Sequence, residues 1–159
     1  MLNAHLLMII FHATSATAAF IVGLALLFQR DLLRQRQLAM ALVVLLILLE
    51  IFLILAILSH LTSLAMVQQI VFGGLGLLGL YMIWRALQAL VLLRQAPDNQ
   101  GAVMDHVGFN LISLFDGFAI VSAIDLQAPG WLVAIIAIGA VALGIYAINS
   151  RKKALNTIS

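Results

Sequence analysis

Residues 38–61 read LAMALVVLLILLEIFLILAILSHL, an apolar run with a single charged side chain, Glu50. A helix of about 20 apolar residues crosses the hydrocarbon core of a bilayer, so this run predicts a transmembrane helix. The composition agrees, since 65% of the 159 residues are hydrophobic and 9% are charged, whereas soluble domains carry about 25% charged residues. A soluble fold could not bury so much apolar surface. We therefore predict an integral membrane protein.

Four further apolar runs predict four more spans. We expect spans at about 5–28, 38–61, 65–84, 103–124 and 131–149, and a helical extension at 85–95 that lies in the headgroup region. Pro97 and Pro129 both fall between predicted spans, where the missing backbone N–H of proline is tolerated. The predicted fold class is all-α, a helical bundle that forms one transmembrane domain over residues 1–159.

The basic residues predict the orientation. With five spans, one side of the membrane carries all eight of them, and the other side carries none. Basic loop residues stay in the cytoplasm, so we expect the N-terminus outside and the C-terminus inside a cell (inner) membrane. Because topology explains these residues, we expect contact with membrane lipid and none with nucleic acid. They are Arg30, Arg34, Arg36, Arg85, Arg94, Arg151, Lys152 and Lys153.

Small residues predict where the helices touch, because helices in lipid associate through close packing. His12 lies on the same side of its helix as Ser15 and Ala19, since each residue turns the helix by about 100°. Its side chain is therefore predicted to point into the bundle. The small residues expected at contacts are Ser15, Ala19, Gly23, Gly73, Gly74, Gly76, Gly79, Ala140 and Gly144.

Two carboxyl groups lie near the centres of predicted spans. Ionisable groups inside a membrane are costly and often functional. Glu50 and Asp116 have similar depths if their helices are upright, so together they could share a proton or hold a cation. The alternative is that each is a neutral acid that hydrogen-bonds to a neighbouring helix and has only a structural role.

A polar stripe occupies one side of the fourth span. His106, Asn110, Ser113 and Gly117 lie close together by helical angle, and Asp116 lies at the edge of the stripe. The stripe predicts a surface lined by water or substrate, or a helix contact rich in hydrogen bonds. With Glu50, Asp116 and His12, its polar residues are the candidates for a pathway that translocates protons, cations or a small solute.

Three histidines near the outer side give an alternative. Two histidines from different helices at one depth can ligate a haem iron, and His60 could pair with His5 or with His12. This predicts a subunit that carries b-type haem or transfers electrons. The paired deep histidines that membrane cytochromes b repeat on two helices are absent.

A third possibility is a non-catalytic subunit of a larger membrane complex. The chain has no cysteine, which excludes disulfides and thiolate chemistry. It has no nucleophile or nucleotide-binding motif, so an enzyme is not favoured. A bundle of this size is small for a transporter, so we expect a homo-oligomer or partner membrane subunits.

Overall fold

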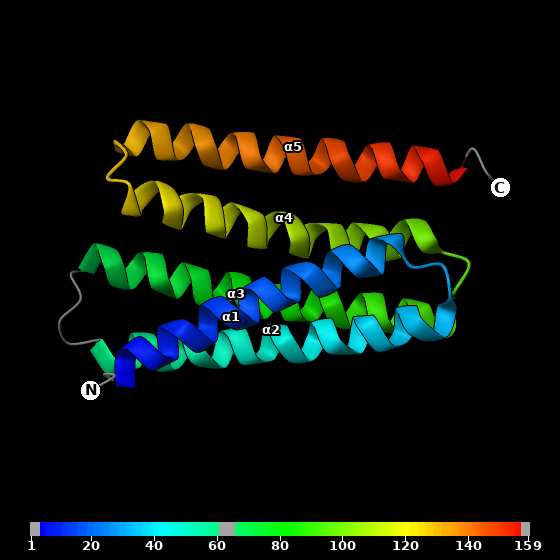
Figure 1. The fold of residues 1–159 in the computed structure, drawn as a ribbon, viewed down its shortest axis with the longest axis horizontal. Helices are drawn as coiled ribbons and strands as arrows, with labels where there is room; N and C mark the ends of the chain where they lie inside the picture. The colour runs from blue at the N-terminus through cyan, green and yellow to red at the C-terminus, as the bar shows by residue number, and fades with distance from the viewer. Residues whose placement is uncertain (1–3, 61–65, 157–159) are drawn as a thin grey trace.

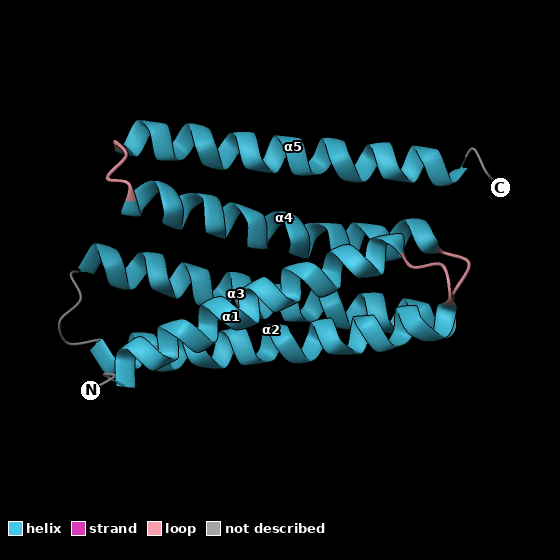
Figure 2. Ribbon diagram, viewed as in Figure 1, coloured by secondary structure: helices cyan, strands magenta, loops and turns pink. Residues whose placement is uncertain are grey.

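The computed structural model describes residues 4–60 and 66–156, in which the regular structure is helical throughout (Figure 2). Five helices follow one another along the chain (Figure 1): α1 (Ala4–Phe28), α2 (Leu32–His60), α3 (Met66–Gln95), α4 (Gln100–Asp125) and α5 (Gly130–Asn156). Each helix is long and apolar enough to cross a membrane. The predicted all-α fold is confirmed, with five helices that could each span a membrane, as in a multi-pass membrane protein.

Two helices extend beyond their predicted limits, and a polar residue caps one of them. α2 begins at Leu32 rather than at residue 38, and the Asp31 side chain accepts a hydrogen bond from the backbone N–H of Leu33 at 3.0 Å. α5 continues to Asn156 rather than ending at residue 149. α3 is one continuous helix that includes both the predicted span at 65–84 from Met66 onward and the predicted helical extension at 85–95. Its apolar stretch is Phe72–Gln95.

The first four helices form a closed group, and the fifth lies outside it. α1 packs on α2 and α4, α2 packs on α3, and α3 packs on α4, whereas α5 packs on α4. In Figure 1, α1 crosses the other helices obliquely, and α5 runs along the edge of the molecule beside α4. The interior of the α1–α4 group is therefore the place where buried polar groups can gather.

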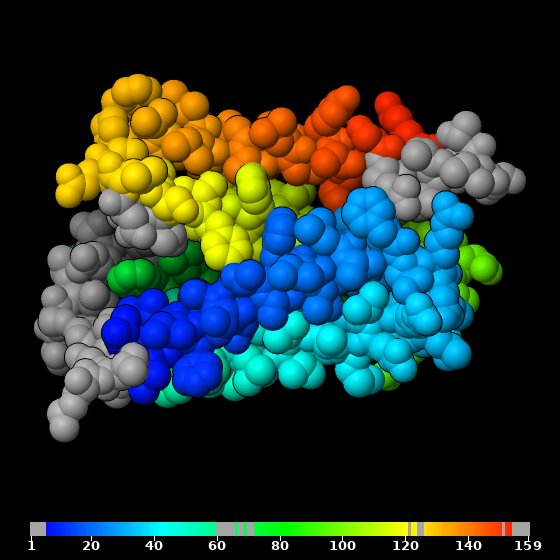
Figure 3. Space-filling view, in the orientation of Figure 1, coloured from blue at the N-terminus to red at the C-terminus, as the bar shows by residue number. Residues whose placement is uncertain are grey.

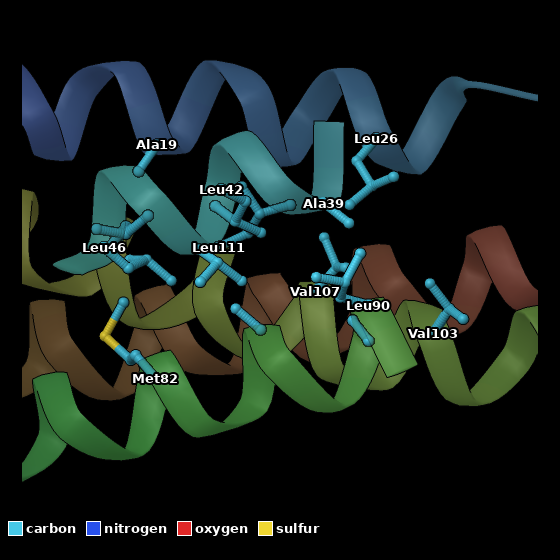
Figure 4. Packing of buried hydrophobic residues seen from close by; sticks show 14 of the residues in the cluster. Ala19, Leu26, Ala39, Leu42, Leu46, Met82, Leu90, Val103, Val107 and Leu111 are labelled. Carbon is cyan, nitrogen blue, oxygen red and sulfur yellow. The ribbon is translucent and has the colours of Figure 1, made fainter. Parts of the chain in front are cut away.

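Leucines fill this interior, and alanines let the helices approach one another. Ala19 of α1 and Ala89 of α3 are both 0% exposed. Figure 4 shows Leu46 of α2, Met82 of α3 and Leu111 of α4 pointing into the same space. Small residues at helix contacts are the usual means of close packing in membranes.

Glycines mark some of the closest contacts but not all of the predicted ones. A Cβ atom on Gly144 of α5 would collide with the side chain of Ile112 on α4. In contrast, Gly73 and Gly74 are exposed, and a Cβ on either would meet nothing within 4 Å. The predicted packing role is therefore wrong for these two glycines. It is confirmed for Ser15, Ala19, Gly23, Gly76, Gly79, Ala140 and Gly144.

Large apolar side chains cover the outside of the bundle. In the space-filling view, α5 forms an outer ridge (Figure 3), and most of its large side chains are exposed: Trp131, Ile135, Ile138, Leu143, Ile145 and Tyr146. Soluble monomers rarely expose an apolar surface of this extent. This surface fits a lipid environment, in agreement with the five candidate spans.

The basic residues gather at one end of the molecule. The connections at 29–31 and 96–99 and the C-terminus lie together at this end (Figure 1). All eight lysines and arginines lie either in these segments or in the half of their helix that is nearer to this end. We call it the basic end. The opposite end holds the N-terminus and the turn at residues 126–129.

Candidate functional site

Glu50 lies in the second half of α2, within the apolar stretch Leu32–Ser59, and is only 3% exposed. A Cβ atom on Gly79 of α3 would collide with its Oε2 atom, and a Cβ on Gly76 would lie 3.5 Å from its Oε1 atom. The carboxyl group therefore lies against the backbone of α3, in space that two glycines leave open. Any larger residue at position 79 would compete with the carboxyl for this space.

The Glu50 carboxyl group has no hydrogen-bond partner among the described residues. Both of its oxygens are shielded from solvent and unpaired. Leaving a buried polar group unpaired costs about 1–3 kcal/mol, and burying an unpaired anion costs more. Both oxygens are consequently available to a proton or to a small cation.

His12 connects α1 to the same level of α2. Its Nδ1 atom donates a hydrogen bond of 3.0 Å to the backbone carbonyl of Leu49, the residue before Glu50. The side chain is half-buried, and Ser15 and Ala19 on the same side of α1 are buried. The predicted orientation of His12 into the bundle is confirmed. With Nδ1 as the donor, a neutral ring keeps Nε2 as a proton acceptor.

The polar stripe of α4 faces the bundle interior at Asn110. This residue is 0% exposed, and neither atom of its amide group has a partner among the described residues. His106 lies one turn nearer the basic end, and its Nδ1 atom is likewise buried and unpaired. Ser113 and Gly117, further along the stripe, are half-buried. The stripe therefore brings unsatisfied donors and acceptors into the core from the side of the basic end.

Asp116 lies on a different side of α4, the side that faces α5. The α5 contacts are made by Gly108, where a Cβ would lie 2.8 Å from Ile148, and by Ile112, which meets Gly144. Asp116 follows Ile112 by four residues and so shares this face. In the antiparallel register of these contacts it lies opposite Ala140, which is 5% exposed. Glu50 faces α3 instead, so the structure does not bring the two carboxyl groups together.

The two carboxyl groups nevertheless share a level in the bundle. Arg85 of α3 bonds to Asp105 of α4, which sets the antiparallel register of these helices. Gly76 lies nine residues before Arg85, so it is opposite the α4 residue nine after Asp105, two before Asp116. Because Gly76 touches Glu50, the two acids lie within about one helical turn along the bundle axis.

A second polar cluster lies near the basic end, and the sequence does not predict it. Lys152 of α5 donates to both carboxylate oxygens of Asp105 at 2.8 Å. Arg85 of α3 donates from Nη2 to the backbone carbonyl of Asp105 at 2.6 Å. Its guanidinium carbon lies 5.2 Å from the centre of the Phe109 ring. Only the antiparallel register of three helices brings these residues together, and no spacing along the chain signals it.

The haem alternative depends on three histidines, and the structure describes the side chain of only one of them, His12. The side chains of His5 and His60 lie outside the described residues, while His12 bonds to a backbone carbonyl. Within the described part of the chain, no group of three or more histidine, aspartate or glutamate side chains could hold a metal ion.

No protein-family model, curated protein or solved structure matches this chain. A functional assignment consequently depends on the chemistry of the buried polar groups.

Proposed function

We propose that this bundle conducts protons across a membrane and that the Glu50 carboxyl group is the central proton-binding group. The observation that carries the proposal is the burial of Glu50 within the apolar stretch of α2 with no hydrogen-bond partner among the described residues. Buried polar groups with a purely structural role are normally hydrogen-bonded. Glu50 instead faces two glycines that offer it no side chain. Acids placed in this way inside a membrane typically belong to ion or proton pathways.

The neighbouring polar groups support a path from the basic end to Glu50. His106 and Asn110 present unpaired donors and acceptors one turn apart on the stripe of α4, and Ser113 continues the same face. An imidazole, an amide and a hydroxyl can each accept and donate a hydrogen bond, directly or through water. His12 of α1, which lies at the level of Glu50, serves as the relay from Glu50 toward the opposite end.

Asp116 has a secondary role in this proposal. It lies at the level of Glu50 but faces α5, so it belongs to a separate environment. Its Oδ1 atom is buried and unpaired among the described residues. We expect it to modulate conduction from the α4–α5 contact rather than to carry the proton between α2 and α3.

The proposal includes an orientation and a location. The gathering of basic residues at one end supports a cytoplasmic basic end and an outer N-terminus, because basic segments resist translocation. Proton conduction has a use only in an energised membrane, so the cell (inner) membrane is the proposed location.

Proton flux into liposomes tests the proposal. The purified protein is reconstituted with a pH-sensitive dye in the lumen, and potassium efflux through valinomycin sets an inside-negative potential. We expect the wild type to acidify the lumen faster than empty liposomes do, and Glu50→Gln, which keeps the side-chain shape, to remove this difference. Asp98→Asn changes an exposed loop carboxyl and is expected to keep wild-type flux. Equal flux through the wild type and Glu50→Gln would overturn the proposal.

A lipophilic carbodiimide gives an independent test of the same site. Such reagents enter the membrane and react with protonated carboxyl groups. We expect dicyclohexylcarbodiimide to block flux through the wild type and to modify Glu50, as located by peptide mass spectrometry. A block that coincides with modification of another carboxyl alone would contradict the role of Glu50.

A further inference from the structure

Arg85 and Lys152 reach the same residue from two different helices. Arg85 extends from α3 to the backbone carbonyl of Asp105, and Lys152 extends from α5 to its carboxylate. Both α3 and α5 pack on α4, which carries Asp105. The two cationic groups thus converge on Asp105 from two different helices, near the basic end of the bundle.

The charge of Arg85 is not neutralised by any described carboxylate. The Asp105 carboxylate is paired with Lys152, and the Asp31 carboxylate is paired with Arg34. The guanidinium group of Arg85 bonds to an uncharged carbonyl and lies over the Phe109 ring. Its Nε atom is shielded from solvent and has no acceptor among the described residues. A half-buried cation in this condition is stabilised by an external anion.

A row of aromatic side chains leads from the Phe109 ring beside the guanidinium group to the exposed surface. Tyr81 packs edge-on against Phe109 at 5.1 Å and stacks on Trp84 at 5.4 Å between ring centres. Tyr81 and Trp84 are 44% and 48% exposed. Amphipathic rings of this kind favour the region where acyl chains meet headgroups. An anionic group that reaches Arg85 along this surface therefore belongs to a molecule with apolar chains.

We propose that Arg85 and Lys152 bind the phosphate of an anionic membrane phospholipid, with Tyr81 and Trp84 against its acyl chains. A guanidinium group binds phosphate oxygens through parallel N–H donors. The three N–H donors of Lys152 exceed the two bonds it makes to Asp105, so its ammonium group contributes a second contact. Basic groups at one membrane face, set between transmembrane helices, are a common arrangement for binding anionic headgroups. This inference does not depend on proton conduction.

Native mass spectrometry of the full-length protein in detergent tests the site. The probes are phosphatidylglycerol and phosphatidylcholine with identical acyl chains. We expect tighter binding of phosphatidylglycerol, and a loss of about tenfold in its affinity for Arg85→Gln, the usual effect of removing a charged hydrogen bond. Lys152→Gln should lose less. Arg34→Gln is the matched control, because Arg34 is exposed at the same end and pairs with Asp31. Its affinity should equal that of the wild type.

Two further measurements, with Arg85→Lys and with inorganic phosphate, distinguish a lipid site from the alternatives. Arg85→Lys retains the charge without the planar group and is expected to bind with intermediate affinity, which covers the case in which Arg85→Gln does not fold. Inorganic phosphate at millimolar concentration should not displace the lipid, and displacement would instead assign the site to a soluble anion. Wild-type affinity in both Arg85 variants, or an equal loss in Arg34→Gln, would overturn the proposal.

Discussion

The carboxyl group of Glu50 on α2 lies directly against the backbone of Gly79 on α3, which contributes no side chain to the contact. An acid on one helix thereby restricts the residue on the next to glycine. The packing of α2 on α3 therefore depends on the proposed proton-binding group. Substitutions at Gly79 should affect proton flux, and substitutions at Glu50 should affect the packing.

Gly79→Ala is expected to destabilise the protein by about 1–3 kcal/mol, the usual range for overpacking a buried contact. The added methyl group would take the place of the Glu50 carboxyl, so the end of this side chain must move into the surrounding apolar packing. Thermal unfolding in detergent, followed by circular dichroism, measures the effect. Proton flux in liposomes should fall as well, since the carboxyl must move from its place.

Gly74→Ala is the control, because a Cβ at this position meets nothing within 4 Å. Alanine is the better helix former by about 1 kcal/mol, so this change should be neutral or stabilising. Combining Gly79→Ala with Glu50→Ala should cost less than the sum of the two single changes, because contacting residues couple. Additive effects would show that the methyl group and the carboxyl do not compete for space.

The sequence predicts the spans of this fold because they depend on composition along the chain. Runs such as 38–61 are recognised by their apolar length, and the location of all eight basic residues at one end follows from the order of the spans without knowledge of packing. The inward orientation of His12 is also predictable, since it follows from small residues on one helix. These properties are local, and helical periodicity suffices to derive them.

The partners of the polar groups depend on relations between helices, and these are not predictable in the same way. Glu50 and Asp116 share a level, as upright helices imply, but a depth comparison gives no information on which neighbour each one faces. The glycine series shows the same limit: Gly79 meets Glu50, whereas Gly73 faces open space. Arg85 reaches Asp105 only through the register of α3 on α4.

Asn110→Leu is expected to leave thermal stability unchanged or to raise it while lowering proton flux. The amide group of Asn110 is fully buried and unpaired among the described residues, and replacing an unsatisfied polar group by an apolar one of similar shape is neutral or favourable. The proposed path, however, would lose a relay group. Circular dichroism melting and liposome flux measure the two effects separately. A clear fall in stability would instead assign Asn110 a structural hydrogen bond.

Single-cysteine labelling is expected to place the basic end in the cytoplasm. The chain has no cysteine, so any introduced thiol is read without background. In intact cells, a membrane-impermeant maleimide should label Leu126→Cys, in the exposed turn between α4 and α5. Asp98→Cys, in the exposed connection between α3 and α4, should react only after lysis. The reverse pattern would invert the proposed orientation.

Gln127→Gly is expected to raise the free energy of unfolding by about 1 kcal/mol, the strain of a side chain in the left-handed conformation. Gln127 has a φ of 56° and follows the last turn of α4. The next residue, Ala128, donates its backbone N–H to the carbonyl of Ala123 at 2.9 Å, a helix-ending bond that normally accompanies glycine. Ala128→Gly is the matched control. Ala128 is not in the left-handed conformation. The glycine variant therefore gains backbone flexibility in the unfolded state without relief of strain, and it should be less stable than the wild type. Thermal unfolding of both variants in one detergent distinguishes the two signs, and a fall in stability for Gln127→Gly would contradict the assigned cap.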